Sequence, residues 1–230
     1  MKHNTDQSFY PILLNLNKFP CLVVGGGKVA YRKVLSLLSF NAEVTVLAPK
    51  ICKSLIEFAN QKKVKLIKKA YTKDFLKNYK IVFSATDNPK INQIVRDDCT
   101  KENILLNVVD NPALCDFILP ANIRRGDLTI SVSSQGKAPF YTKEMKRKLE
   151  QFISPIHADI ITIAGEFRKQ LLNYLERNKK QISKSEAAIL KANLFKRFTV
   201  QDWEKILMGN GHKSSKQYVQ KLLRENKVFK

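Results

Sequence analysis

The sequence predicts an α/β protein whose doubly wound parallel sheet is followed by a smaller unit with antiparallel character and by a helical last third. Three observations lead to this prediction. A run of three glycines separates a strand-like segment from a helix-like segment at residues 20–38, strand-like and helix-like segments alternate as far as residue 109, and this alternation stops after Asp110.

The glycine turn at residues 25–27 is the most informative of the three. It follows the apolar run 21–24 and precedes apolar residues at helical spacing. Gly25, Gly27 and Ala30 fit the dinucleotide fingerprint G-x-G-x-x-[GA] in the strand-to-helix setting that it requires. The first glycine permits the tight turn, the second lets a pyrophosphate approach, and the small third residue lets the helix pack on the strand. The pattern favours a dinucleotide site over an ordinary glycine turn, because the helix would also offer free N–H groups to phosphates.

The expected acidic residue is missing from this site. Such a residue usually lies about 20 residues after the glycines and binds the ribose. Here the second strand, 44–47, ends in Ala48, Pro49 and Lys50. Backbone groups could bind the ribose instead, or Lys50 could favour a 2′-phosphate, so the motif leaves NAD and NADP open.

Each element up to residue 109 follows from its apolar pattern. We expect strands at 21–24, 44–47, 64–67, 81–85 and 104–109, and helices at 28–39, 51–60 and 91–103. Alternating strands and helices indicate a parallel sheet, and ligands bind such sheets at the carboxyl ends of the strands. These ends are the glycine turn, residues 48–50, residues 85–88 and Asp110.

The pattern after Asp110 predicts a second unit. Residues 124–127 are typical of a turn, residues 128–132 alternate as a half-buried strand does, and residues 133–139 form a polar loop before a helix that begins near Phe140.

The last third is predicted to be helical. Ser154 is the expected N-cap of a long helix with Pro155 at its first position. Ser183 and Glu186 resemble a capping box, Thr199 and Asp202 a weaker one, and Gly209-Asn-Gly211 reads as a turn before a final helix at 216–223. An apolar stripe, more typical of a core or a dimer surface than of cofactor contacts, runs along the long helix through Ile153, Ile156, Ile160, Ile163, Ala164, Phe167, Leu171 and Leu175.

Composition narrows the class of protein. The 230 residues are 44% hydrophobic, which indicates a folded chain, and 41 Lys and Arg against 20 Asp and Glu give a net charge of +21. Such a charge suits an acidic ligand, nucleic acid or a membrane surface. No nucleic-acid-binding motif stands out and no stretch reaches 18 apolar residues, so we expect neither a nucleic-acid partner nor a membrane span.

The cysteines indicate a reducing compartment. Cys21, Cys52, Cys99 and Cys115 form no C-x-x-C pair and lie far from the three histidines in the sequence, which predicts buried free thiols and no metal site. The N-terminus lacks the apolar core of a signal peptide, so we expect a cytoplasmic protein.

Several motifs together resemble one family, the precorrin-2 dehydrogenases and the N-terminal module of siroheme synthase. They keep their order over roughly residues 8–150: Tyr10-Pro-Ile, the glycine turn with Arg32-Lys33, Ser84-Ala-Thr-Asp87 with Asn92, Asn107-Val-Val-Asp110, Phe117-Ile-Leu-Pro120, and Ser131 to Pro139. The loop 133–139 departs from the family's usual S-S-G-G-x-S-P, because Gln135 and Ala138 replace its first glycine and its last serine.

The resemblance implies an enzyme and its cofactor. The implied reaction is the NAD-dependent oxidation of precorrin-2 to sirohydrochlorin in siroheme or cobalamin biosynthesis. An alternative is a bifunctional enzyme that also inserts ferrous iron or cobalt into sirohydrochlorin. The implied architecture is a Rossmann domain at 1–112, a dimerisation unit at 113–150 and a helical domain at 151–230, assembled as a homodimer.

The resemblance also assigns roles to residues. By the resemblance, NAD contacts would come from Lys28, Val29, Pro49 and Lys50, in addition to Gly25 and Gly27 of the fingerprint. Thr86, after the fourth strand, is a further candidate for cofactor binding. Asp110 would be the catalytic residue, a role that its position favours over a helix or turn cap beside Pro112. Asp87 is a second candidate, although Asp-Asn-Pro is also a common turn. The matching position for a serine that some members phosphorylate is Ser134. Precorrin-2 carries eight carboxylates, which fits the positive charge, and Arg124, Arg125 and Lys137 are candidates to meet them.

Overall fold

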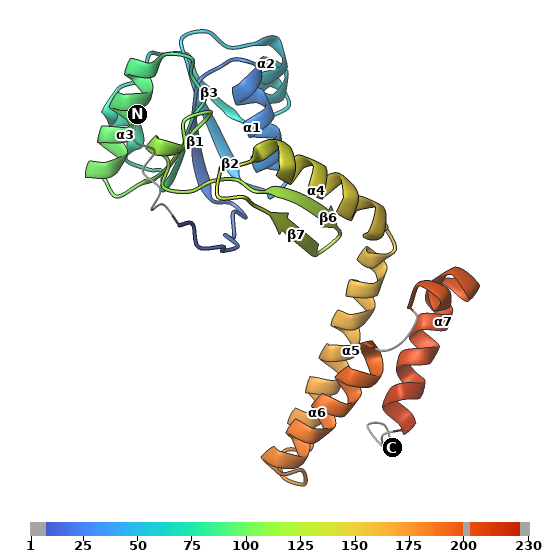
Figure 1. Ribbon diagram of the computed structural model, residues 1–230. Coiled ribbons are helices and arrows are strands. Elements are labelled where there is room, and N and C mark those ends of the chain that lie inside the picture. Colours follow the sequence, from blue (N-terminus) through green and yellow to red (C-terminus); the bar gives the residue numbers. More distant parts are fainter. Residues whose placement is uncertain (1–7, 200–202, 226–230) are drawn as a thin grey trace. The chain divides into compact units, whose positions relative to one another are not determined.

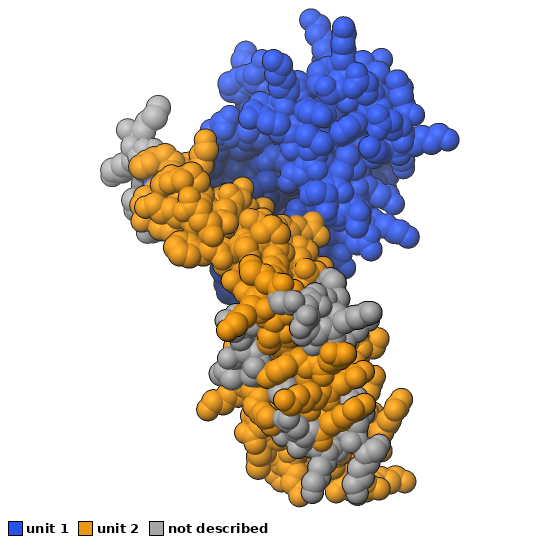
Figure 2. Space-filling view, turned by 90° about the vertical axis from the view of Figure 1, so that its right-hand side faces the viewer, with its two compact units in different colours: residues 1–119, 135–138 blue, residues 120–134, 139–230 orange. Residues whose placement is uncertain are grey.

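The computed structural model describes residues 8–199 and 203–225, drawn in Figure 1. They divide into two compact units (Figure 2). Unit 1 comprises residues 1–119 and 135–138, and unit 2 comprises residues 120–134 and 139–230.

Unit 1 is built on a parallel sheet of five strands. In chain order the strands are β1 (Pro20–Val24), β2 (Glu43–Leu47), β3 (Lys65–Ile67), β4 (Ile81–Ser84) and β5 (Leu105–Val108). They lie side by side in the order β3-β2-β1-β4-β5. The order reverses between β1 and β4, and parallel sheets of this kind bind ligands at such a reversal, outside the carboxyl ends of the strands. Val24, the last residue of β1, pairs with Leu47 on one side and Ser84 on the other, so three strand ends meet there.

Helices cover both faces of this sheet (Figure 1). The helices α1 (Lys28–Leu38) and α2 (Lys53–Asn60) pack on the face that carries Cys21 and Val23, and α3 (Pro89–Lys101) packs on the face that carries Leu22 and Val24. Because both faces are buried, the central strands are continuous apolar runs rather than alternating ones. Two short 3-10 helices, η1 (Lys73–Leu76) and η2 (Pro112–Leu114), complete the unit.

The five predicted strands and three predicted helices of this unit are confirmed, with small shifts at their ends. Helix α3 begins at Pro89, earlier than predicted, because the Asn88 side chain caps it by accepting from the N–H groups of Lys90 (3.0 Å) and Ile91 (3.4 Å). Proline suits the first helical position, where no N–H is needed.

Unit 2 begins with an antiparallel hairpin of β6 (Ala121–Arg125) and β7 (Leu128–Val132). Its two-residue turn starts with Gly126 at φ +57°, which favours glycine at the first turn position. The predicted turn and the strand at 128–132 are confirmed, but β6 had not been predicted. Only Ile123 is buried along β6, so its sequence lacks a clear apolar alternation. Helix α4 (Pro139–Phe152) follows, close to its predicted start.

Three longer helices complete unit 2: α5 (His157–Arg177), α6 (Lys184–Thr199) and α7 (Trp203–Glu225). The predicted stripe on α5 is largely confirmed, because Ile163, Phe167, Leu171 and Leu175 are buried in the core that α5 shares with α6 and α7. Aromatic rings join these helices, with the centroids of Phe198 and Trp203 4.3 Å apart. The Trp203 indole N–H donates to the Phe198 carbonyl at 2.8 Å.

Two predictions in unit 2 are wrong. Helix α5 begins at His157 rather than at Pro155, and the buried Ser154 hydroxyl has no hydrogen-bond partner, so it does not cap the helix. Gly209-Asn-Gly211 is not a turn, since α7 runs continuously through it. Each glycine costs a helix about 1 kcal/mol, and the burial of Trp203, Leu207 and Val219 on the same helix outweighs that cost.

The capping box at the start of α6 is confirmed. The Ser183 hydroxyl accepts from the Glu186 N–H at 3.2 Å, and Glu186 accepts from the Ser183 N–H at 2.9 Å. Asp202, in the weaker box, lies outside the described residues.

Among the described residues, no helix is long and apolar enough to cross a membrane, and no three acidic, cysteine or histidine side chains gather as a metal site would require. Of the four free cysteines, Cys21, Cys99 and Cys115 are buried and Cys52 is half-buried.

Candidate functional site

On one side of the glycine turn after β1, neighbouring backbone atoms leave no space for a side chain. Gly25 has φ +127°, and a Cβ atom there would lie 2.3 Å from the Ala85 carbonyl oxygen. A Cβ at Gly26 would lie 2.1 Å from the Lys50 carbonyl oxygen, because the chain after β2 packs directly on this glycine. The Cys52 N–H also donates to the Gly26 carbonyl at 2.8 Å. Neither position has room for any other residue.

The other side of the turn is open. A Cβ at Gly27 would meet no heavy atom within 4 Å. Gly27 is the N-cap of α1, it offers no side-chain cap, and the first turn of the helix carries no acidic residue. Open space beside uncapped N–H groups at a positive helix end is what a pyrophosphate needs, so these residues fit a dinucleotide. Ala30 is fully buried, as the close packing of helix on strand requires.

The end of β2 lies beside the same turn. Ala48 is buried and its N–H donates to the Ile67 carbonyl at 3.1 Å, whereas Pro49 and Lys50 are exposed. The segment 48–52 contains no carboxylate, as the sequence already showed. Backbone groups and the Lys50 ammonium are therefore what this strand end presents to a ligand.

The loop after β4 is held by side chains. The buried Ser84 hydroxyl donates to the Asn92 side-chain oxygen at 2.7 Å, and the Asn92 amide donates to the Thr86 carbonyl at 3.2 Å. The Thr86 hydroxyl accepts from the Asn88 N–H at 3.1 Å. Asp87 is exposed on this loop.

The end of β5 presents Asp110 at the same edge of the sheet. Asp110 is exposed and has φ +61°, a left-handed conformation that aspartate adopts more readily than most residues. Beneath it, the buried Cys115 sulfur accepts from the Val108 N–H at 3.1 Å, which braces the turn.

A lysine on α1 lies within electrostatic reach of Asp110. The Lys33 ammonium sits 5.4 Å from the centroid of the Phe83 ring. Burial lowers the pKa of Lys33, while the charges of Cys115 and Asp110 partly offset that effect.

All the residues predicted to bind NAD, and Asp110, follow the carboxyl ends of strands within unit 1. Sequence reasoning gave no role to Gly26, whose requirement for glycine comes from a contact with a distant segment, or to Lys33, Ser84 and Asn92, which act through packing and hydrogen bonds. The only feature of the sequence that could have pointed to these residues is that they lie within the motifs that resemble the family.

The basic candidates for substrate carboxylates have different surroundings. Arg125, in unit 2, donates to the Ile153 carbonyl at 2.9 Å, and Arg124 donates to the Gly126 carbonyl at 3.2 Å. Both therefore make backbone contacts within their own unit. Lys137 lies in unit 1, beside Gln135, whose side chain accepts from the Phe9 N–H at 2.8 Å.

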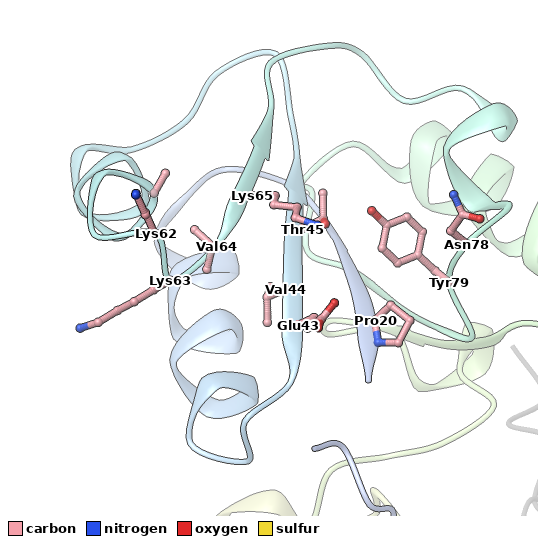
Figure 3. A pocket seen from close by; sticks show the side chains of 11 residues that line it. Pro20, Glu43, Val44, Thr45, Lys62, Lys63, Val64, Lys65, Asn78 and Tyr79 are labelled. Atoms are coloured by element: carbon pink, nitrogen blue, oxygen red, sulfur yellow. The ribbon is translucent and has the colours of Figure 1, made fainter. Parts of the chain in front are cut away.

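A hollow of about 750 Å³ lies elsewhere in unit 1 (Figure 3). It is lined by residues at the amino ends of β1, β2 and β3, with the Tyr79 ring on one side (Figure 3). Because parallel sheets bind ligands at the opposite, carboxyl ends, this hollow is not the dinucleotide site. Its lining residues are Pro20, Glu43, Val44, Thr45, Ala59, Lys62, Lys63, Val64, Lys65, Asn78 and Tyr79.

Comparison with known proteins agrees with this geometry. Residues 12–121, which hold the parallel sheet and its glycine turn, match a family described as "Putative NAD(P)-binding". The chain is 36% identical over 164 residues to a siroheme synthase of Ruthia magnifica subsp. Calyptogena magnifica, covering 71% of this chain and 35% of that protein. It is 40% identical over 163 residues to a siroheme synthase of Pseudoalteromonas translucida, covering 71% of this chain and 34% of that protein.

In sequence, the chain is therefore similar to part of these siroheme synthases. It spans about a third of the length of the siroheme synthases that it matches. A solved structure of "SirC, precorrin-2 dehydrogenase" shares its fold, with a TM-score of 0.71, 22% identity, and coverage of 94% of this chain and 100% of that one.

Proposed function

We propose that this protein catalyses the NAD-dependent dehydrogenation of precorrin-2 to sirohydrochlorin, in siroheme or cobalamin biosynthesis. The observation that carries the proposal is the pairing of two features at one edge of the sheet. The open, uncapped glycine turn after β1 fits a dinucleotide, and Asp110 presents an exposed carboxylate after β5, which β4 separates from β1. The sequence identity to siroheme synthases supports the choice of substrate.

Each residue of the edge has a distinct part in this proposal. Gly25 shapes the turn, and Gly27, Lys28 and Val29 hold the pyrophosphate through backbone N–H groups. Pro49 and Lys50 contact the adenosine end. Thr86 lies beside the turn, on the loop that follows β4.

Asp110 is the proposed base. When bound, the nicotinamide would supply the hydride acceptor, and oxidation of the macrocycle would also release one proton. The Asp110 carboxylate takes that proton.

NAD is the proposed form of the cofactor, with NADP as the alternative that Lys50 leaves open. Titration of the protein with NADH and NADPH in parallel decides between them. Stronger binding of NADH supports the proposal. Stronger binding of NADPH, lost in Lys50→Ala, would instead assign Lys50 to a 2′-phosphate.

The role of Asp110 is tested by Asp110→Ala. We expect kcat for sirohydrochlorin formation to fall at least 100-fold, in the range that general bases contribute, with little change in NAD affinity. Asp87→Ala is the matched control, because Asp87 is also exposed at the same edge, and we expect this variant to keep its activity. Equal losses in both variants would remove Asp110 from the role of base.

The assembly and compartment are part of the same proposal. The protein would be a cytoplasmic homodimer that forms through a dimerisation unit at residues 113–150. In the sequence, this unit follows a Rossmann domain at 1–112 and precedes a helical domain at 151–230. Sedimentation of the purified chain at several concentrations tests the dimer, which a single monomeric species at all concentrations would contradict.

Chelation is the second candidate, because siroheme, the product named for the relatives, contains iron. Here Fe²⁺ or Co²⁺ is a substrate that the macrocycle itself holds, so no cysteine–histidine site is needed. Metal insertion into sirohydrochlorin by the protein without NAD would support it, and an uncatalysed rate would remove it.

A further inference from the structure

We propose that Ser84 and Asn92 are positioning residues for dinucleotide binding, which hold the loop between β4 and α3 against the glycine turn. The inference rests on the proposed function and adds two residues that contact no ligand themselves. It concerns hydrogen bonds entirely within unit 1.

The two side chains form a buried relay from the sheet to the loop. Ser84 is the last residue of β4 and is fully buried, and Asn92 is 8% exposed. The Ser84 hydroxyl donates to the Asn92 oxygen at 2.7 Å, and the Asn92 nitrogen donates to the Thr86 carbonyl at 3.2 Å. The amide therefore uses its oxygen on the strand and its nitrogen on the loop, and only this orientation satisfies both.

Further hydrogen bonds hold the rest of the loop in place. The Thr86 hydroxyl accepts from the Asn88 N–H at 3.1 Å, and the Asn88 carbonyl accepts from the Asn92 N–H at 3.1 Å. The Asn88 side chain also caps α3. A shift of the Asn92 side chain would therefore move the Thr86 carbonyl and the start of α3 together.

The loop touches the glycine turn directly. The Ala85 N–H donates to the Val24 carbonyl at 2.7 Å. A Cβ at Gly25 would lie 2.3 Å from the Ala85 carbonyl oxygen and 3.2 Å from the Thr86 nitrogen. Because the loop and the glycine turn are in such close contact, displacement of the loop would either shift the turn or change the open space next to it. Misplacement by about 1 Å is enough to weaken a preorganised site.

The decisive variant is Asn92→Asp, which keeps the shape and changes one atom. The oxygen that accepts from Ser84 remains, but the donor to the Thr86 carbonyl becomes an ionised oxygen that repels it. We expect NADH, followed by its fluorescence at pH 8, to bind about 10-fold more weakly than to the wild type, the loss that one net hydrogen bond corresponds to. Ser84→Ala should weaken binding less, because the bond to Thr86 survives.

A pH profile separates this role from a merely structural one. When the introduced carboxyl is protonated, it can donate to the Thr86 carbonyl again. The affinity of Asn92→Asp for NADH should therefore recover toward the wild-type value as the pH falls, while the wild-type affinity changes little over the same range.

Val95→Ala is the matched control. Val95 is fully buried on the same helix, and its apolar side chain cannot form a hydrogen bond to the loop. It should lower the melting temperature and leave NADH affinity unchanged. The inference is overturned if Asn92→Asp binds as the wild type does, or if Val95→Ala weakens binding equally. Wild-type protein that binds neither NADH nor NADPH would overturn the proposed function as well, so the two failures are distinguishable.

Discussion

At the scale of single residues, the three glycines of the turn meet three different environments. A side chain at Gly25 or Gly26 would collide with backbone, whereas one at Gly27 would enter open space. The first two glycines are therefore needed for the fold of unit 1, and the third only for the space that a ligand would fill.

This difference predicts opposite behaviour for two alanine variants. Gly26→Ala should unfold easily, with a melting temperature several degrees lower, because the Lys50 carbonyl cannot move without displacing the chain after β2. Gly27→Ala should melt as the wild type does but bind NADH at least 10-fold more weakly, since the new methyl occupies the pyrophosphate's place. Thermal melts and NADH titrations check both.

Equal melting temperatures with unchanged NADH binding in Gly27→Ala would contradict the placement of the dinucleotide. An undisturbed melt in Gly26→Ala would contradict the close packing at Lys50.

How much of the site the sequence could predict depends on where each residue's constraint comes from. Gly25, Gly27 and Asp110 carry local signals, a motif and a strand end, and sequence reasoning placed them all at one edge of the sheet. Gly26 and Asn92 are constrained by segments elsewhere in the chain. No local pattern distinguishes such a glycine or asparagine from one in an ordinary turn or on a helix surface.

At the scale of helices and strands, the accuracy of the prediction depends on the strength of the apolar pattern in each segment. The buried strands of the parallel sheet, such as β1 and β4, are unbroken apolar runs and were predicted almost to the residue. Strand β6 buries only Ile123, so its pattern was too weak. The glycines at 209 and 211 were taken for a turn because their local cost is visible in the sequence, while the tertiary packing of α7 that offsets it is not.

The cap of α6 gives a prediction with a defined pH dependence. Hydrogen bonds from the Ser183 hydroxyl and N–H lower the pKa of Glu186. A carboxyl whose pKa is lowered by folding contributes stability above its unfolded value, near 4.3, and loses it as the pH falls through the folded pKa. Ser183→Ala should therefore lower the melting temperature at pH 7, and the difference from wild type should shrink at pH 3.

Thr162→Ala is the control for this series, because it also removes one hydroxyl from a helix of unit 2, where Thr162 bonds to the Ala158 carbonyl. Its effect on melting should be the same at pH 7 and pH 3. A pH-independent difference for Ser183→Ala would show that the capping box contributes nothing through Glu186.

At the scale of the whole molecule, the net charge of +21 bears on the proposed substrate, precorrin-2, rather than on the fold. Precorrin-2 carries eight carboxylates, and attraction between exposed charges is screened over about 10 Å at 0.1 M salt and about 3 Å at 1 M. We therefore expect KM for precorrin-2 to rise steeply with salt and kcat to change little. Steady-state rates at increasing potassium chloride check this.

NADH affinity measured in the same salt series is the internal reference. It should fall less, because the dinucleotide carries fewer charges than the tetrapyrrole. A KM for precorrin-2 that is independent of salt would contradict an electrostatic role for the basic surface.

The most direct test of the central claim is an anaerobic reaction of the full chain with precorrin-2 and NAD⁺, in which NADH and sirohydrochlorin are followed together. We expect them to appear at the same rate and in equal amounts, and neither to appear without the protein. Folded protein that forms no sirohydrochlorin with either NAD⁺ or NADP⁺, or that forms it without reducing the dinucleotide, would contradict the assignment as a dehydrogenase.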